Sequence, residues 1–182
     1  AATDIENMVK FAKDNAIDLV MVAPDDPLVL GMVDAMEKEG IRAFGPRANA
    51  AIIEGSKAFS KELMKKYNIP TANYEVFTDS TSAIDYIKAQ NTFPTVIKAD
   101  GLALGKGVII AQNLEEAEQA VHEMIDDGKF GKSGSRVVIE EFLTGPEVSV
   151  LAFTDGKTVK PMVSAQDHKR AYDNDEGLNT GG

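Results

Sequence analysis

Apolar residues in the first fifty positions recur in two alternating patterns. Apolar positions three or four apart predict amphipathic helices, whereas continuous apolar runs bounded by turn residues predict buried strands. Thr3 and Glu6 have the spacing of a capping box and would begin the first helix. The predicted order is helix, strand, helix, strand, at Thr3–Asn15, Ile17–Ala23, Leu28–Glu39 and Ile41–Phe44. A strand, a helix and a second strand in this order predict a βαβ unit with parallel strands.

The pattern changes after Pro46. A short helix at Ala48–Glu54 should end at Gly55, and Ser56 can cap a longer helix that runs to Tyr67. Further strands are predicted at Ala72–Phe77, Thr95–Ala99, Val108–Gln112 and 135–142, and further helices at about 80–89, capped by Asp79 or Ser80, and 113–126, beginning at Asn113. Residues 147–165 predict two strands joined by Asp155-Gly156, and residues 166–182 predict a polar loop. The second part is therefore an α+β unit built on antiparallel hairpins.

Composition narrows the classes of function. The 182 residues are 43% hydrophobic and 26% charged, which suits a folded protein with a sizeable core. Cysteine is absent, which excludes disulfides, thiolate metal sites and a cysteine nucleophile. A net charge of −10 disfavours nucleic acid or an anionic membrane as the main partner. A phosphate ligand needs only a few local cations and stays possible. No signal peptide is visible, and the first residue and the ending NTGG lead us to expect a piece of a longer protein.

The stretch VIKADGLALGKGV (96–108) places glycines and lysines at the tip of a predicted hairpin. It lacks the spacing and the following helix of a P-loop or a dinucleotide-binding fingerprint. Glycines without a Cβ let backbone N–H groups approach an anion closely, and Lys98 can add a point charge to phosphate oxygens. The same loop taken alone is equally typical of a solvated, mobile hairpin tip.

Two further segments favour the phosphate interpretation. Lys57 lies in the first turn of a predicted helix, where a cation is unfavourable unless an anion binds beside it. In VVIEEFLTGPEVSV (137–150), Phe142 and Leu143 offer apolar walls to a purine, and Glu147 can accept from ribose hydroxyls. The simpler alternatives are a surface lysine and an ordinary strand followed by a charged turn.

Four segments, in order and spacing, resemble the ATP-grasp superfamily: GSKAFSKELMKKYNIPTA, VIKADGLALGKGV, VIEEFLTGPEVSV and AQDHKRAYDNDEGLNTGG. Within it they resemble the glycinamide ribonucleotide synthetase (phosphoribosylamine–glycine ligase) family, over Asp18–Gly182. The resemblance implies an α/β plus α+β fold. Residues 1–50 would be the remainder of a Rossmann-like N-terminal (pre-ATP-grasp) domain, and residues 51–182 an ATP-grasp domain that is incomplete at the C-terminus.

The resemblance also implies a reaction in purine biosynthesis. ATP, with Mg²⁺ (or Mn²⁺), would phosphorylate the carboxylate of glycine. The amine of 5-phosphoribosylamine would then displace phosphate, giving glycinamide ribonucleotide, ADP and phosphate. This route needs no side-chain nucleophile. The expected partners are these small molecules, without nucleic acid or membrane, and the intact enzyme is expected to be a cytoplasmic monomer. The 182-residue chain alone is expected to be inactive.

The resemblance implies roles for individual residues. Lys57 and Lys98 would hold ATP phosphates, and Glu140 would take the adenine amino group. The other ATP-binding positions are the loop residues Asp100, Gly101, Gly105, Lys106 and Gly107, the hinge residues Glu141, Phe142 and Leu143, and Glu147 at the ribose. Glycine and phosphoribosylamine would face Asp167, His168, Lys169, Asn179, Thr180, Gly181 and Gly182. His122 lies on a predicted amphipathic helix and is interpreted as structural.

The match has three departures. The family's first strand and its glycine-rich turn do not precede Ala1, and its metal-binding acid and asparagine would lie beyond Gly182. The sequence has an extra acid at Asp25 or Asp26, where the family more often has a small or apolar residue, which puts a substrate contact there in doubt. Three alternatives remain: an ATP-grasp carboxylase or ligase with another acid substrate, a non-catalytic nucleotide-binding module, and a structural protein.

Overall fold

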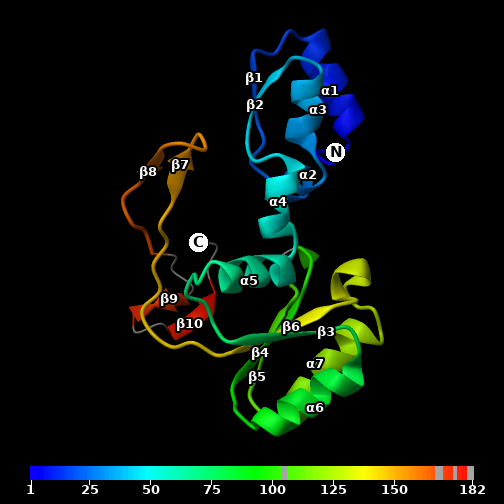
Figure 1. The fold of residues 1–182 in the computed structure, drawn as a ribbon, viewed down its shortest axis with the longest axis vertical. Helices are drawn as coiled ribbons and strands as arrows, with labels where there is room; N and C mark the ends of the chain where they lie inside the picture. Colours follow the sequence, from blue (N-terminus) through cyan, green and yellow to red (C-terminus); the bar gives the residue numbers. More distant parts are fainter. Residues whose placement is uncertain (104–105, 167–169, 174–175, 180–182) are drawn as a thin grey trace. The chain divides into compact units, whose positions relative to one another are not determined.

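Figure 1 shows the computed structural model of the chain, which describes residues 1–103, 106–166, 170–173 and 176–179. The chain forms two compact units, Ala1–Phe142 and Leu143–Gly182. Among the described residues, the larger unit contains one hydrophobic core near the N-terminus and another beside a four-stranded sheet.

The N-terminal elements form the predicted βαβ unit. They are the helices α1 (Ile5–Asp14), α2 (Asp25–Val29) and α3 (Met32–Lys38) and the strands β1 (Leu19–Met21) and β2 (Arg42–Phe44). The two strands pair in parallel, with Leu19 opposite Arg42. The core beside them consists of Ala12, Val22, Met32, Val33 and Met36. Parallel pairing follows because the intervening helices return the chain to the same end of the sheet.

Three details of this region differ from the prediction. The first helix is capped by Asp4 and not by Thr3, since the Asp4 carboxylate accepts from the Asn7 backbone N–H at 3.3 Å. The predicted single helix at 28–39 is two helices, because Gly31 takes a left-handed φ of +89° between them. The first strand is not fully buried: Leu19 and Met21 are exposed, because alternate residues face away from the covering helices.

Two consecutive helices connect this region to the sheet. The helix α4 (Ala48–Gly55) is followed at once by α5 (Lys57–Lys66). Ser56 separates them in an extended conformation, and its hydroxyl accepts from the Phe59 backbone N–H at 3.1 Å. This confirms Ser56 as the predicted N-cap, and it fixes the direction in which α5 begins.

The second core lies against one face of an antiparallel sheet with the strand order β3-β6-β4-β5. The strands are β3 (Tyr74–Phe77), β4 (Thr95–Ala99), β5 (Val108–Ala111) and β6 (Val137–Glu141). The helices α6 (Ser80–Gln90) and α7 (Leu114–Ile125) cover that face, and α5 lies on the other side (Figure 1). A short 3-10 helix, Gly131–Gly134, precedes β6. The antiparallel hairpins predicted after Pro46 are therefore confirmed.

The caps predicted for the two covering helices are also confirmed. Asp79 accepts from the Ser82 N–H at 2.8 Å, and Asn113 accepts from the Glu116 N–H at 3.0 Å. Each bond satisfies a backbone donor that the first helical turn leaves unpaired.

In the part of the smaller unit that the structure describes, the short strands pair in antiparallel fashion. Strands β7 (Ala152–Thr154) and β8 (Val159–Pro161) pair in antiparallel fashion around the predicted turn, where Gly156 has a φ of +85°. Strands β9 (Arg170–Tyr172) and β10 (Glu176–Asn179) pair likewise. The prediction of a polar loop over 166–182 is therefore wrong there, because backbone pairing does not require the apolar side chains on which the prediction relied.

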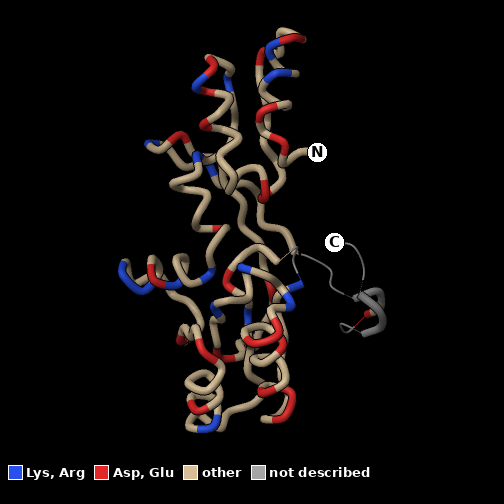
Figure 2. The backbone as a smooth tube through the Cα atoms, turned by 90° about the vertical axis from the view of Figure 1, so that its right-hand side faces the viewer, with Lys and Arg blue, Asp and Glu red and all other residues tan. Residues whose placement is uncertain are grey.

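Acidic and basic positions are interleaved along the helices of the larger unit (Figure 2). Lys13 and Glu39, for example, form an exposed ion pair, a kind of contact that contributes little to stability. Within the described residues, no helix combines the length and apolar character needed to cross a membrane.

Two isoleucines on the neighbouring strands β4 and β5 provide a test of the core. Ile97 on β4 is fully buried, whereas Ile110 on β5 is 47% exposed. Ile97→Ala should lower the free energy of unfolding by about 2–5 kcal/mol, because it removes buried methyl groups and leaves a cavity. Ile110→Ala is the matched control and should cost less than about 1 kcal/mol. Urea denaturation of both variants measures the difference, and equal losses would contradict the assignment of the core.

Candidate functional site

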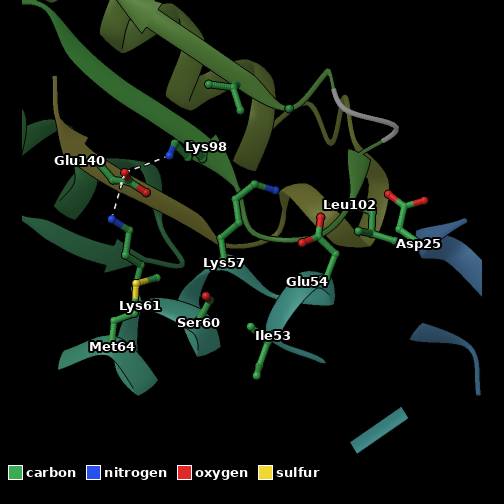
Figure 3. A pocket seen from close by; sticks show the side chains of 12 residues that line it. Asp25, Ile53, Glu54, Lys57, Ser60, Lys61, Met64, Lys98, Leu102 and Glu140 are labelled. Carbon is green, nitrogen blue, oxygen red and sulfur yellow. Dashed lines mark hydrogen bonds and ion pairs between the residues drawn. The ribbon is translucent and has the colours of Figure 1, made fainter. Parts of the chain in front are cut away.

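A cavity of about 340 Å³ opens on the side of the sheet that faces α5 (Figure 3). It combines three lysines, three carboxylates and several apolar side chains. The lining residues are Asp25, Ile53, Glu54, Lys57, Ser60, Lys61, Met64, Lys98, Leu102, Gly107, Val108 and Glu140. The cavity thus brings three cations together in a chain whose net charge is −10, and three carboxylates lie among them.

Lys57 stands at the first position of α5 and is half-buried. Its ammonium donates to the Gly101 carbonyl oxygen at 2.7 Å, across to the glycine loop. Burial lowers the pKa of the Lys57 ammonium, and the neighbouring Lys98 acts in the same direction, while Asp100 opposes both. The positive end of the helix dipole also disfavours a cation at this position. An anion bound in the cavity would relieve both effects.

Lys98 and Glu140 meet across the sheet from β4 and β6. The Lys98 ammonium donates to Glu140 Oε2 at 2.9 Å, and Lys61 from α5 lies 3.1 Å from the same oxygen (Figure 3). Glu140 is only 5% exposed, and its other oxygen, Oε1, is buried without a hydrogen-bond partner among the described residues. A buried acceptor without a donor is costly, so a ligand N–H that reached this oxygen would stabilise it.

Asp100 fixes the start of the glycine loop. One carboxylate oxygen accepts from the Ser56 hydroxyl at 3.0 Å and from the Ala58 backbone N–H at 2.7 Å. The other oxygen accepts from the Arg136 guanidinium, with Nε at 3.0 Å. The Asp100 carboxylate therefore faces the beginning of α5, and it holds the loop and Lys57 in one arrangement.

The loop glycines are placed where the chain passes other residues closely. A Cβ on Gly101 would lie 2.3 Å from the Ser133 Oγ, and one on Gly107 would lie 2.7 Å from the Ala103 Cβ. Lys106 is exposed, and Gly105 lies outside the described residues. Gly101 and Gly107 are therefore required by packing at the base of the loop, whatever the loop binds.

The hinge that is predicted to lie along the adenine base, residues 141–143, begins in the larger unit. The Glu141 carboxylate accepts from the backbone N–H and the side-chain amide of Asn73, at 2.9 and 3.1 Å. Phe142 is 39% exposed, and Leu143 and Glu147 belong to the smaller unit and are exposed. The structure thus gives Glu141 a partner on the neighbouring chain segment and leaves Phe142 accessible.

The predicted substrate residues fall almost wholly outside the described part of the chain: Asp167, His168, Lys169, Thr180, Gly181 and Gly182. Asn179 ends β10, where only the backbone is described. His122, interpreted as structural, lies on the exposed side of α7, with Nδ1 2.5 Å from the Asp126 carboxylate. Across the described residues, no group of three or more His, Cys, Asp or Glu side chains is arranged to hold a metal.

Lys61 is the principal cavity residue that the sequence interpretation missed. It is 6% exposed and follows Lys57 by four residues, so both project from one face of α5. That spacing could have indicated it, but its burial depends on contacts with distant strands. Asp25 and Glu54 also line the cavity and were not predicted to do so.

Comparison with known proteins first identifies the class of protein. A model of the ATP-grasp (A) domain of phosphoribosylglycinamide synthetase matches residues 55–182, which contain the antiparallel sheet and most of the cavity. A biotin carboxylase domain of 2-oxoglutarate carboxylase from Hydrogenobacter thermophilus has a similar fold, with a TM-score of 0.72 at 23% identity over 89% of this chain and 37% of that one. Residues 55–182 therefore belong to the ATP-grasp class.

The particular family follows from the closer matches. A model of the N domain of phosphoribosylglycinamide synthetase matches residues 1–54, and with the A domain it accounts for the whole chain. The chain belongs to the phosphoribosylglycinamide synthetase family. A phosphoribosylamine–glycine ligase from Haemophilus influenzae is 54% identical over 182 residues, which are 100% of this chain and 42% of the relative. One from Halalkalibacterium halodurans is 55% identical over 179 residues, 98% of this chain and 42% of the relative.

A solved structure agrees with these matches. The phosphoribosylamine–glycine ligase from Thermotoga maritima superposes with a TM-score of 0.69 at 40% identity, over 76% of this chain and 35% of that one. The present chain thus spans less than half the length of the relatives that it matches.

The contact between Gly101 and Ser133 predicts a rescue experiment. Gly101→Ala should destabilise the chain by about 1–3 kcal/mol, because the new methyl group would overlap the Ser133 side chain. Ser133→Gly removes that side chain, and the double variant should regain much of the loss. Thermal unfolding of the two single variants and the double variant measures the coupling. If the stability losses of the two single variants simply added in the double variant, the two side chains would not be in steric conflict.

The lowered pKa of Lys57 predicts how pH affects stability. Between that pKa and the ordinary value of about 10.5, the unfolded chain binds more protons at this residue than the native chain. The destabilisation by Lys57 is thus full at neutral pH and is relieved as pH rises through this window. Lys57→Met removes the titrating group, so its stability relative to the parent should fall with rising pH. Urea denaturation from pH 7 to 10 measures this, with the exposed Lys65→Met as control; a constant difference would contradict it.

Proposed function

We propose that this chain is the nucleotide-binding part of an ATP-dependent ligase that joins glycine to 5-phosphoribosylamine. The reaction would pass through glycyl phosphate and give glycinamide ribonucleotide, ADP and phosphate. The observation that carries the proposal is the convergence of Lys57, Lys98 and the unpartnered Glu140 oxygen at one cavity. Family membership and the names of the relatives support the choice of this ligase among ATP-grasp enzymes.

The side chains of the cavity suit a nucleoside triphosphate. Lys57 and Lys98 supply cations for phosphate oxygens, and Glu140 Oε1 supplies an acceptor for the adenine amino group. Met64 and Val108 give apolar surface for a planar base. When bound, ATP supplies the phosphoryl group that activates a carboxylate. The task of the chain is then to hold the phosphates, neutralise their charge and exclude water.

The glycine loop is proposed to cover the phosphates. Its base is fixed by Asp100 and by the close approach of Gly101 to Ser133. Backbone N–H groups of such a loop can donate to phosphate oxygens, and Lys106 can add a charge from the exposed side. Asp100 itself would act by position, because its oxygens accept from Ser56, Ala58 and Arg136.

The remaining assignments extend the same proposal. Glu141, Phe142 and Leu143 would line the base, and Glu147 would accept from the ribose. The substrates would face Asp167–Lys169 and Asn179–Gly182. Mg²⁺ (or Mn²⁺) is proposed to accompany ATP through the phosphates and a small number of carboxylates, which is the usual mode of Mg²⁺ binding in such sites.

The domain organisation is proposed on similar grounds. Residues 1–50 would be the remainder of a Rossmann-like domain, which the parallel pair β1–β2 and its helices support. Residues 51–182 would belong to the ATP-grasp domain, and the two family models meet close by, between residues 54 and 55. The intact enzyme is proposed to be a cytoplasmic monomer.

Replacement of Lys98 tests the phosphate assignment. A non-hydrolysable ATP analogue with Mg²⁺ should bind the chain, and Lys98→Ala should weaken binding about 10–100-fold, because a charge-assisted bond to phosphate is lost. Glu140 would keep Lys61 as a partner in this variant. Lys88→Ala, which removes a surface lysine paired with Glu118, is the matched control and should leave the affinity unchanged.

Calorimetric titration measures all three affinities. Equal binding by the parent and Lys98→Ala would remove Lys98 from the phosphate site, and failure of the parent to bind any adenine nucleotide would overturn the proposed function. In the protein that contains the rest of the relatives' length, ADP formation should require both glycine and 5-phosphoribosylamine. A different carboxylic acid that supported turnover equally well would reassign the substrate.

A further inference from the structure

Lys61 is buried to an extent that is unusual for a lysine. Its side chain is 8% exposed, although it comes from a helix whose neighbouring residues Glu62 and Lys65 face solvent. Lysine is almost never fully buried unless its ammonium is paired. The contacts of this ammonium therefore explain why the residue lies here.

Three oxygens surround the Lys61 ammonium. It donates to the Thr71 hydroxyl at 2.7 Å and to the Ala72 carbonyl at 3.3 Å, and it lies 3.1 Å from Glu140 Oε2. The ring of Tyr74 lies 5.6 Å away on a further side. The first two contacts are hydrogen bonds, and the contact with Glu140 is an ion pair. An ammonium has three donors, so these protein oxygens compete with any ligand for them. Lys61 thus lines the cavity with its ammonium directed to protein oxygens, unlike a lysine whose ammonium is free to bind phosphate.

The consequence appears on Glu140. Lys61 and Lys98 both bind Oε2, so this oxygen is fixed from two elements, α5 and β4 (Figure 3). The carboxylate then has one orientation, in which Oε1 is the unpartnered acceptor of the cavity. Without Lys61, Lys98 would be the remaining cation on Glu140, and the plane of the carboxylate could rotate away from this orientation.

We propose that Lys61 is a positioning residue that sets the base preference of the cavity. It holds Glu140 so that Oε1 accepts from the exocyclic amine of a 6-aminopurine nucleotide. A 6-oxopurine presents a carbonyl oxygen at the same point, which offers no donor and faces the carboxylate charge. The cavity therefore prefers adenine nucleotides to hypoxanthine nucleotides, and the preference depends on a residue that does not touch the base. The inference rests on the proposed function, and it names Lys61 as the residue that orients Glu140 in the proposed nucleotide site.

The test compares two nucleotides that differ at the 6-position, ADP and inosine diphosphate, each with Mg²⁺, by calorimetric titration. The parent chain should bind ADP at least about tenfold more tightly, as expected when a site built for an N–H donor meets an analogue without it. Lys61→Met keeps the length and the apolar packing of the side chain but removes the ammonium. It should lower the ratio of the two affinities to about a third or less of the parent value.

Two variants separate positioning from a general structural role. Lys61→Arg keeps a cation beside Glu140 and should retain most of the preference. Lys65→Met changes an exposed lysine on the same helix that lies 6.0 Å from the same Tyr74 ring, and it should leave the ratio unchanged. If Lys61→Met weakens both nucleotides by the same factor, Lys61 supports the fold and does not set the preference, and the proposal is overturned.

A double variant tests whether Lys61 acts through Glu140. In Glu140→Gln the carboxylate is absent, so the addition of Lys61→Met should change the affinity ratio little further. If Lys61→Met lowered the affinity ratio in the Glu140→Gln variant as much as in the parent, Lys61 would not act through Glu140. Should Lys61→Met not fold, Thr71→Val removes one anchor of the ammonium at 2.7 Å and should lower the ratio in the same direction, and an unchanged ratio would count against the proposal. A parent that binds neither nucleotide would instead refute the proposed function.

Discussion

The buried carboxylate of Glu140 is the constraint around which the site is organised. It is shared by Lys98 from β4 and Lys61 from α5, so one ionic cluster joins the sheet to the helix that lies on it. Burying such charges is costly, and removal of one partner leaves another without compensation. The cluster therefore fixes the geometry of the cavity wall more than it adds to stability.

A second carboxylate performs the corresponding task for the glycine loop. Asp100 directly follows the strand that carries Lys98, and its carboxylate accepts from the N-terminus of α5 and from the Arg136 guanidinium. The two lysines proposed to hold phosphate are thereby held in fixed relative positions, because a carboxylate contacts the element that carries each of them.

Much of the local structure could be predicted from the sequence. The cap at Ser56, the bounds of Thr95–Ala99 and the turn at Asp155-Gly156 all depend on residues within a few positions of one another. The cap at Asp4 and the break at Gly31 were missed because neighbouring residues offered competing local patterns. The lysines and glycines of the site were found for the same local reason, together with the resemblance of four segments to one family.

Most of the order of elements, the hairpin β4–β5, the cavity lysines Lys57 and Lys98 and the family could be inferred from the sequence. Which charges meet depends on how the elements pack. Glu140 and Lys61 are far apart in the chain, and so are Gly101 and Ser133, yet each pair is in contact. Such pairs could not be inferred because the burial of a charge and the close approach of two backbones arise only when strands and helices pack. A spacing rule that describes neighbours along one element contains no information about that packing.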